Sequence, residues 1–104
     1  MIRVRFHTAD DAIVGFTLSG HAGAGDHGQD IVCAAVSSAA YMTANTITEI
    51  LGLPADIAVE DGYLSLQVSG ELTSCQTVLA GFRLHIEAMQ QEYPKRIQLM
   101  NTEV

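Results

Sequence analysis

A histidine and a cysteine stand twelve residues apart in the segment SGHAGAGDHGQDIVCAAVSSA, which runs from Ser19 to Ala39. His21 follows a predicted strand, and Cys33 lies at the start of a predicted helix. The chain between them is rich in glycine, which occupies four of the first ten positions of the segment. These residue types are compatible with a cysteine nucleophile and its base, a phosphate-binding loop, a metal site, or a connection without chemistry.

The nucleophile interpretation depends on where Cys33 falls in its helix. Asp30 is a good N-cap residue, which makes Cys33 the third residue of the first turn. Free backbone N–H groups and the positive end of the helix dipole stabilise a thiolate there, and the thiolate is the nucleophilic form. The imidazole of His21, folded back over the helix start, would pair with the thiolate and later protonate a leaving amine. The first-turn N–H groups would be donors to the oxyanion of a tetrahedral intermediate.

The phosphate interpretation starts from GAGDHG, Gly23–Gly28, which matches the pattern G-x-G-x-x-G. That pattern binds a pyrophosphate when it joins the strand and helix of a parallel βαβ unit, whereas the strand here belongs to a predicted hairpin. Asp26 and Asp30 also place negative charge where the phosphates would lie. The sequence therefore disfavours a nucleotide site.

The metal interpretation would use His21, His27 and Cys33, which are spaced by six residues. Zinc ligands on one loop are usually closer in sequence, and a fourth ligand would have to come from elsewhere. Cys75 falls on an apolar helical stripe and is expected to be buried in the core. We therefore expect neither a metal ion nor another cofactor.

The last interpretation assigns no chemistry to the segment. Free cysteines are more often inert core residues than nucleophiles, and glycines are ordinary turn residues. On spacing alone, this interpretation stays open beside the cysteine nucleophile.

Alternating apolar residues predict the strands that must position His21. Residues 2–6 and 14–18 alternate around a polar turn at Thr8–Asp11, and predict a hairpin with one buried face. Residues 57–59 and 64–68 flank Asp61-Gly62, a strong hairpin turn signal. Ile97 and Leu99 predict a short last strand.

Two segments have helical periodicity. The first begins at Ile31 and ends at Gly52, with Pro54 just beyond, and the second ends before Pro94. The apolar positions of the first helix are Val32, Ala35, Val36, Ala39, Met42, Ile47, Ile50 and Leu51. The second helix has one apolar stripe at alternating spacings of three and four, made by Leu72, Cys75, Leu79, Phe82, Ile86, Met89 and Tyr93. The order ββαββαβ, with a five-stranded sheet and two helices, predicts an α+β two-layer sandwich.

Composition limits the class of protein. The 104 residues, 48% of them hydrophobic, are expected to form a single domain over residues 1–104. No run of 18 apolar residues or secretory signal pattern is found, so we expect a soluble cytoplasmic protein without a membrane span. The net charge of −7 disfavours direct nucleic-acid binding and favours basic partners.

The same segment resembles the signature of the ribosomal-processing cysteine proteases (Prp). That signature reads G-H-A, a short glycine-bearing loop, and then G-x-D-I-V-C-A-A-V-S, and this chain has Gly20-His21-Ala22 followed by the run from Gly28 to Ser37. The motif covers about a fifth of the chain, and the chain length and element order agree with the family throughout.

The resemblance implies a cysteine endopeptidase with Cys33 as the nucleophile and His21 as the general base and acid. The implied substrate is the N-terminal extension of a large-subunit ribosomal protein precursor, and the implied assembly is a homodimer. A ribosome-associated binding module without catalysis, with a mobile glycine loop, is the alternative that we keep open.

Several further residues are candidates for substrate binding or for the loop that covers the substrate. Asp30 is either a helix cap or a third catalytic residue that orients His21. Ser37 either bonds back to the Cys33 carbonyl, as helical serines do, or contacts the substrate. The candidate hinge glycines are Gly20, Gly23, Gly25 and Gly28.

Overall fold

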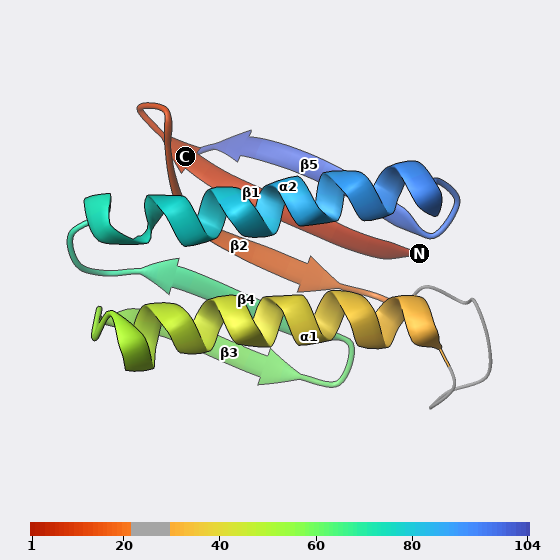
Figure 1. Ribbon diagram of the computed structural model, residues 1–104, viewed down its shortest axis with the longest axis horizontal. Coiled ribbons are helices and arrows are strands. Elements are labelled where there is room, and N and C mark those ends of the chain that lie inside the picture. The colour runs from red at the N-terminus through yellow and green to blue at the C-terminus, as the bar shows by residue number, and fades with distance from the viewer. Residues whose placement is uncertain (22–29) are drawn as a thin grey trace.

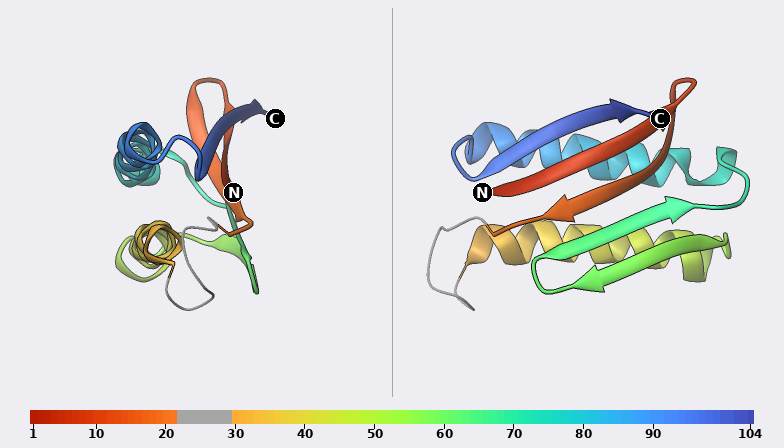
Figure 2. Two further views of the ribbon diagram at one scale, coloured as in Figure 1. Left: turned by 90° about the vertical axis from the view of Figure 1, so that its right-hand side faces the viewer. Right: turned by 180° about the vertical axis from the view of Figure 1, so that it is seen from behind.

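The computed structural model describes residues 1–21 and 30–104, which form one mixed sheet covered on one face by two helices (Figures 1 and 2). The predicted ββαββαβ order and two-layer α+β architecture are confirmed. A π-helix, Thr46–Ile50, continues α1, and a 3₁₀ turn, Thr73–Cys75, precedes α2. The main elements are β1 (Ile2–Ala9), β2 (Ala12–Ser19), α1 (Ile31–Asn45), β3 (Ala55–Glu60), β4 (Tyr63–Val68), α2 (Gln76–Glu92) and β5 (Ile97–Glu103).

The sheet has the strand order β3-β4-β2-β1-β5. The two predicted hairpins pair antiparallel and are joined by an antiparallel β2–β4 pair, whereas β5 lies parallel to β1. In the β2–β4 pair, Ser19 lies opposite Tyr63. The chain leaving β2 and the turn between β3 and β4 therefore lie at the same end of the sheet, next to the start of α1 (Figure 1).

The first hairpin differs from its prediction at both ends of the turn. Its strands reach Ala9 and Ala12, so only Asp10 and Asp11, both with positive φ, form the turn. A register shift leaves Val14 without a partner in β1, since His7 pairs with Gly15 and Thr8 with Ile13. This bulge brings Ile13 into the core cluster. Val14, which the simple alternation had assigned to the buried face, is buried at 6% exposure but lies outside that cluster.

The second helix agrees with its predicted stripe. Its central positions are buried against the sheet, and Leu72 and Tyr93 pack at the two ends of the core. Phe82 lies against Phe6 and Phe16, with ring centroids 5.5 and 4.8 Å away. Burying aromatic side chains of this size contributes on the order of 2 kcal/mol each.

The buried stripe of the first helix agrees with the prediction only in part. Val32, Val36 and Ile47 are buried as predicted. Met42 and Ile50 are instead 65% and 79% exposed, because the stripe runs through Ala40, Thr43 and Ala44. The buried residues are Val32, Val36, Ala40, Thr43, Ala44 and Ile47. The helix Ile31–Ile50 is long and apolar enough to cross a membrane, a property that core helices share, and here its buried stripe belongs to the core cluster.

Gln76 ties the helix layer to the bulge in β2. Its side-chain Oε1 accepts from the Ile13 N–H at 2.8 Å, and its Nε2 donates to the Ile13 carbonyl at 2.8 Å. The same amide donates to the Leu72 carbonyl at 3.0 Å. One side chain therefore satisfies both backbone groups of a residue next to the bulge.

Candidate active site

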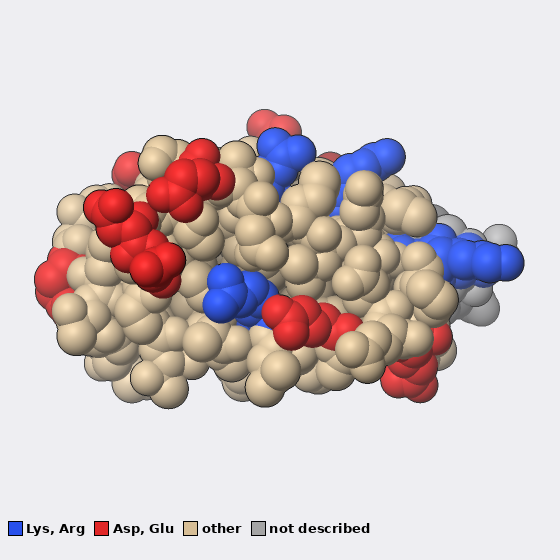
Figure 3. Space-filling view, turned by 90° about the horizontal axis from the view of Figure 1, so that it is seen from above, with Lys and Arg blue, Asp and Glu red and all other residues tan. Residues whose placement is uncertain are grey.

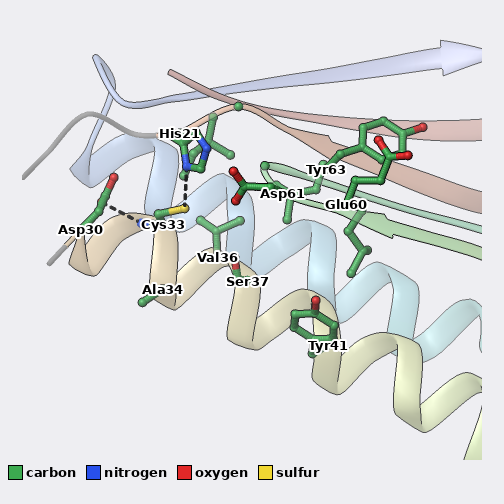
Figure 4. Close-up of a pocket in the computed structure, with 15 residues that line it drawn as sticks. His21, Asp30, Cys33, Ala34, Val36, Ser37, Tyr41, Glu60, Asp61 and Tyr63 are labelled. Atoms are coloured by element: carbon green, nitrogen blue, oxygen red, sulfur yellow. Dashed lines mark hydrogen bonds between the residues drawn. The ribbon is translucent and has the colours of Figure 1, made fainter. Parts of the chain in front are cut away.

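The structure brings His21 and Cys33 together at one end of the molecule (Figure 4). The Cys33 Sγ and the His21 Nδ1 are 3.9 Å apart, so the histidine does lie over the start of the helix. Catalytic contacts are often long without substrate and shorten when the reacting complex forms. The separation is therefore compatible with a nucleophile and its base.

The start of α1 sets the position of Cys33. Asp30 has extended backbone dihedrals and is the N-cap, as predicted, and its Oδ1 accepts from the Cys33 N–H at 2.9 Å. The Ala34 N–H donates to the Asp30 carbonyl at 3.0 Å. Because the Cys33 N–H already donates to Asp30, it is not free to donate to an oxyanion. The sequence had predicted that the N–H groups of the first turn would serve as such donors.

The residue before His21 fixes the direction in which the chain leaves β2. Gly20 has a φ of +89°, and its N–H donates to the Gly62 carbonyl at 2.9 Å. A side chain at Gly20 would collide with the Met1 carbonyl. Gly20 was predicted as a hinge, and the structure gives it a steric reason to be glycine.

A pocket of about 600 Å³ opens beside the histidine and the cysteine. One wall is α1, with Cys33, Ser37 and Tyr41 at successive helical turns, and the other wall is formed by residues 60–64 of the β3–β4 hairpin (Figure 4). Cys33 is half-buried and His21 is exposed, so both are reachable from this side. A cleft of this size, mostly apolar with a few polar groups, suits a ligand such as a peptide.

The pocket is acidic. Its described lining residues include Asp30, Glu60 and Asp61 and no lysine or arginine. Elsewhere, Figure 3 shows a face on which acidic side chains gather towards the left-hand end, while acidic and basic side chains are mixed over the centre and the right-hand end. The acidic excess of the chain therefore extends to the cleft that holds the cysteine.

Ser37 lies one turn after Cys33 and lines the pocket. Among the described residues no hydrogen bond joins its hydroxyl to the Cys33 carbonyl, so the predicted back-bond is absent. Such bonds do occur farther along this helix, where the Thr43 and Thr46 hydroxyls donate to the Ala39 and Met42 carbonyls, both at 2.8 Å. Ser37 lies on the pocket wall, so contact with the substrate is the remaining hypothesis for its role.

The β3–β4 turn is the part of the site that the sequence interpretation missed. Asp61 and Gly62 were predicted only as a hairpin turn, but both line the pocket, and Gly62 lies against the His21 ring. Figure 4 shows the Asp61 carboxylate directed towards the histidine and the cysteine. No local pattern reveals this proximity, because it depends on the pairing of β2 with β4.

Several predicted residues lie outside the described part of the chain. These are Gly23, Gly25 and Gly28, together with His27 and the rest of the G-x-G-x-x-G pattern. Within residues 1–21 and 30–104, no group of three or more His, Cys, Asp or Glu residues is arranged to hold a metal ion.

The other cysteine has a different environment. Cys75 is fully buried, its thiol donates to the Leu72 carbonyl at 3.3 Å, and burial raises its pKa. Both cysteines are free thiols. Cys33 is therefore the thiol in a position to react with a substrate.

Known proteins are similar to this chain in sequence and in fold. The profile of a family described as "Cysteine protease Prp" matches residues 1–98. The ribosomal processing cysteine protease Prp of Bacillus subtilis is 26% identical over 97 residues, which cover 86% of this chain and 87% of that protein. The protein of the same name from Staphylococcus aureus is 27% identical over 103 residues, or 95% of this chain and 97% of that protein.

A solved structure resembles this one over nearly its whole length. It is the essential ribosomal processing protease Prp from S. aureus in complex with a covalently linked product peptide. The TM-score is 0.87 at 25% sequence identity, and the alignment covers 98% of this chain and 100% of that chain.

Proposed function

Because the chain belongs to the cysteine protease Prp family, we propose that it is an endopeptidase with Cys33 as the nucleophile and His21 as the general base and acid. Its proposed substrate is the precursor of a large-subunit ribosomal protein, from which it removes an N-terminal extension. The observation that carries this proposal is the 3.9 Å approach of Cys33 Sγ and His21 Nδ1 at the wall of a peptide-sized pocket.

The proposed reaction has two stages. His21 takes the thiol proton, and the Cys33 sulfur attacks the carbonyl carbon of the scissile bond to form a tetrahedral intermediate. The intermediate collapses to a thioester as the carbon–nitrogen bond breaks, and the imidazolium gives its proton to the leaving amine. His21 then takes a proton from water, hydroxide attacks the thioester, and the released thiolate regains a proton from the imidazolium.

Charge supports a basic substrate. The chain carries a net charge of −7, and three acidic side chains line the described part of the pocket. Ribosomal proteins bind RNA and are typically basic, so their peptides would be attracted to such a cleft. The S. aureus relative was crystallised with a covalently linked product peptide, which is compatible with a cysteine nucleophile in the family.

The test is cleavage of a synthetic precursor peptide followed by mass spectrometry. We expect the wild-type chain and a Cys75→Ala variant to cleave it, because the Cys75 thiol is buried away from the pocket. We expect Cys33→Ala to be inactive and His21→Ala to lose on the order of a hundredfold or more in kcat. Both variants should unfold at urea concentrations close to wild type, since neither side chain belongs to the buried core.

Equal cleavage by wild type and Cys33→Ala would exclude the nucleophile assignment. Tight binding of the uncut precursor without any cleavage would instead favour the ribosome-associated binding module. Isothermal titration with the same peptide separates these two results.

A further inference from the structure

The β3–β4 turn lies directly against the imidazole of His21. Gly62 occupies this turn with a φ of +69°, a conformation that side chains disfavour. A Cβ placed on Gly62 would lie 2.9 Å from the His21 Nε2 and 3.5 Å from both Cδ2 and Cε1. The turn therefore packs against the Nε2 side of the His21 ring, whereas the other ring nitrogen, Nδ1, lies near Cys33.

The turn is also joined to the backbone that carries the histidine. The Gly20 N–H donates to the Gly62 carbonyl at 2.9 Å, immediately before His21 in the chain. Ser19 pairs with Tyr63 in the adjacent step of the β2–β4 register. The hairpin thus fixes the main chain on the N-terminal side of His21 and limits where its ring can lie.

We propose that Gly62 is a positioning residue of the protease, whose missing side chain allows the β3–β4 turn to seat the His21 imidazole within reach of Cys33. This inference rests on the proposed His21/Cys33 function. The atoms that an added Cβ would meet belong to the end of a rotatable side chain, so the cheapest adjustment is a movement of the ring. A substitution at Gly62 should therefore disturb the chemistry more than the fold.

Gly52 provides a matched control. Its φ is +67°, nearly the same as that of Gly62, but a Cβ on Gly52 would meet no atom within 4 Å. Gly52→Ala and Gly62→Ala therefore carry a similar backbone strain, and only the second change affects His21. Gly52→Asn and Gly62→Asn form a second pair, because asparagine tolerates the left-handed conformation better than alanine.

The experiment measures alkylation of Cys33 by iodoacetamide across pH on the folded full chain, together with kcat and KM on the precursor peptide. For Gly62→Ala we expect alkylation at about pH 6.5 and kcat both about tenfold below wild type, with KM little changed, since small displacements of reacting groups are costly. Gly52→Ala should stay within about twofold of wild type in each quantity, because its strain is remote from the site. If Gly62→Ala does not fold, the asparagine pair gives the same comparison.

The outcomes separate this inference from the proposed function. His21→Ala should lower the rate at which Cys33 is alkylated, and an unchanged rate would show that the histidine does not activate Cys33. If His21→Ala lowers this rate while the Gly62 variants match their Gly52 counterparts, the assignment of His21 and Cys33 stands and the positioning role of Gly62 is wrong.

Discussion

The Asp30 carboxylate accepts a hydrogen bond from the Cys33 N–H at 2.9 Å, so the residue that caps helix α1 also holds the backbone of the proposed nucleophile. This contact fixes where the helix begins and therefore where the sulfur lies relative to His21. The same carboxylate places a negative charge three residues before the thiol. Two substitutions separate the role of the cap from the role of the charge.

Asp30→Asn keeps an oxygen that accepts the Cys33 N–H and removes the charge. We expect it to unfold at nearly the wild-type urea concentration and to cleave at least as well as wild type. Asp30→Ala removes the cap and should lower the free energy of unfolding by about 1 kcal/mol, with reduced cleavage because the first turn frays. Urea unfolding and precursor cleavage measure both effects, and an Asp30→Asn variant that folds normally but fails to cleave would assign Asp30 a catalytic role.

Gln76 holds the two layers together at the bulge in β2. Gln76→Met should leave the Ile13 N–H and carbonyl without their side-chain partner and cost about 1–3 kcal/mol in the free energy of unfolding. The control is Gln91→Met, the same chemical change at an exposed position of α2. Cleavage by the folded fraction should not change, since Gln76 does not line the pocket. Equal urea midpoints for the two variants would show that the Gln76 bonds add nothing to stability.

The features that sequence patterns predicted are those with local causes. The stripe of α2 follows from the spacing of its apolar side chains, and the cap at Asp30 follows from one residue type before an apolar run. The Asp61-Gly62 turn is likewise specified by the two residues that form it. In each case the interaction that selects the structure spans only a few residues of chain.

The features that sequence patterns did not predict depend on contacts between distant segments. The bulge at Val14 lies next to the hydrogen bonds that the Gln76 side chain of α2 makes with the Ile13 backbone. The parallel pairing of β5 with β1 depends on how α2 crosses the sheet. The approach of Gly62 to His21 requires the β2–β4 pair. The motif therefore singled out His21 and Cys33, which the fold places 3.9 Å apart, whereas the pocket wall opposite them came only from the fold.

His7 predicts a modest pH dependence of stability. Burial lowers the pKa of His7 from its usual 6.5, the neighbouring Arg5 lowers it further, and its Nε2 lies 2.9 Å from the Thr17 hydroxyl. Between the lowered pKa and 6.5 the unfolded chain binds more protons at this residue than the folded chain does, so stability falls as pH decreases through that window.

The measurement is the free energy of unfolding in urea at about pH 7.5 and about pH 5.5. Wild type should lose more stability between these values than His7→Gln, because glutamine does not titrate. The comparison between variants removes the contribution of other groups. An identical pH dependence for the two proteins would mean that the environment of His7 does not oppose its protonation.

The two cysteines should differ in reactivity while the chain is folded. Cys33 is half-buried at the pocket wall, whereas Cys75 is fully buried and burial raises its pKa, so the reactive thiolate is disfavoured there. A disulfide exchange reagent at neutral pH should therefore modify one thiol quickly in wild type and in Cys75→Ala, and none in Cys33→Ala. Adding urea should release the second thiol of wild type at the same denaturant concentration that unfolds the chain. Two fast thiols in the folded wild type would contradict the burial of Cys75, and a fast thiol in Cys33→Ala would identify Cys75 as an accessible competitor for the same reagents.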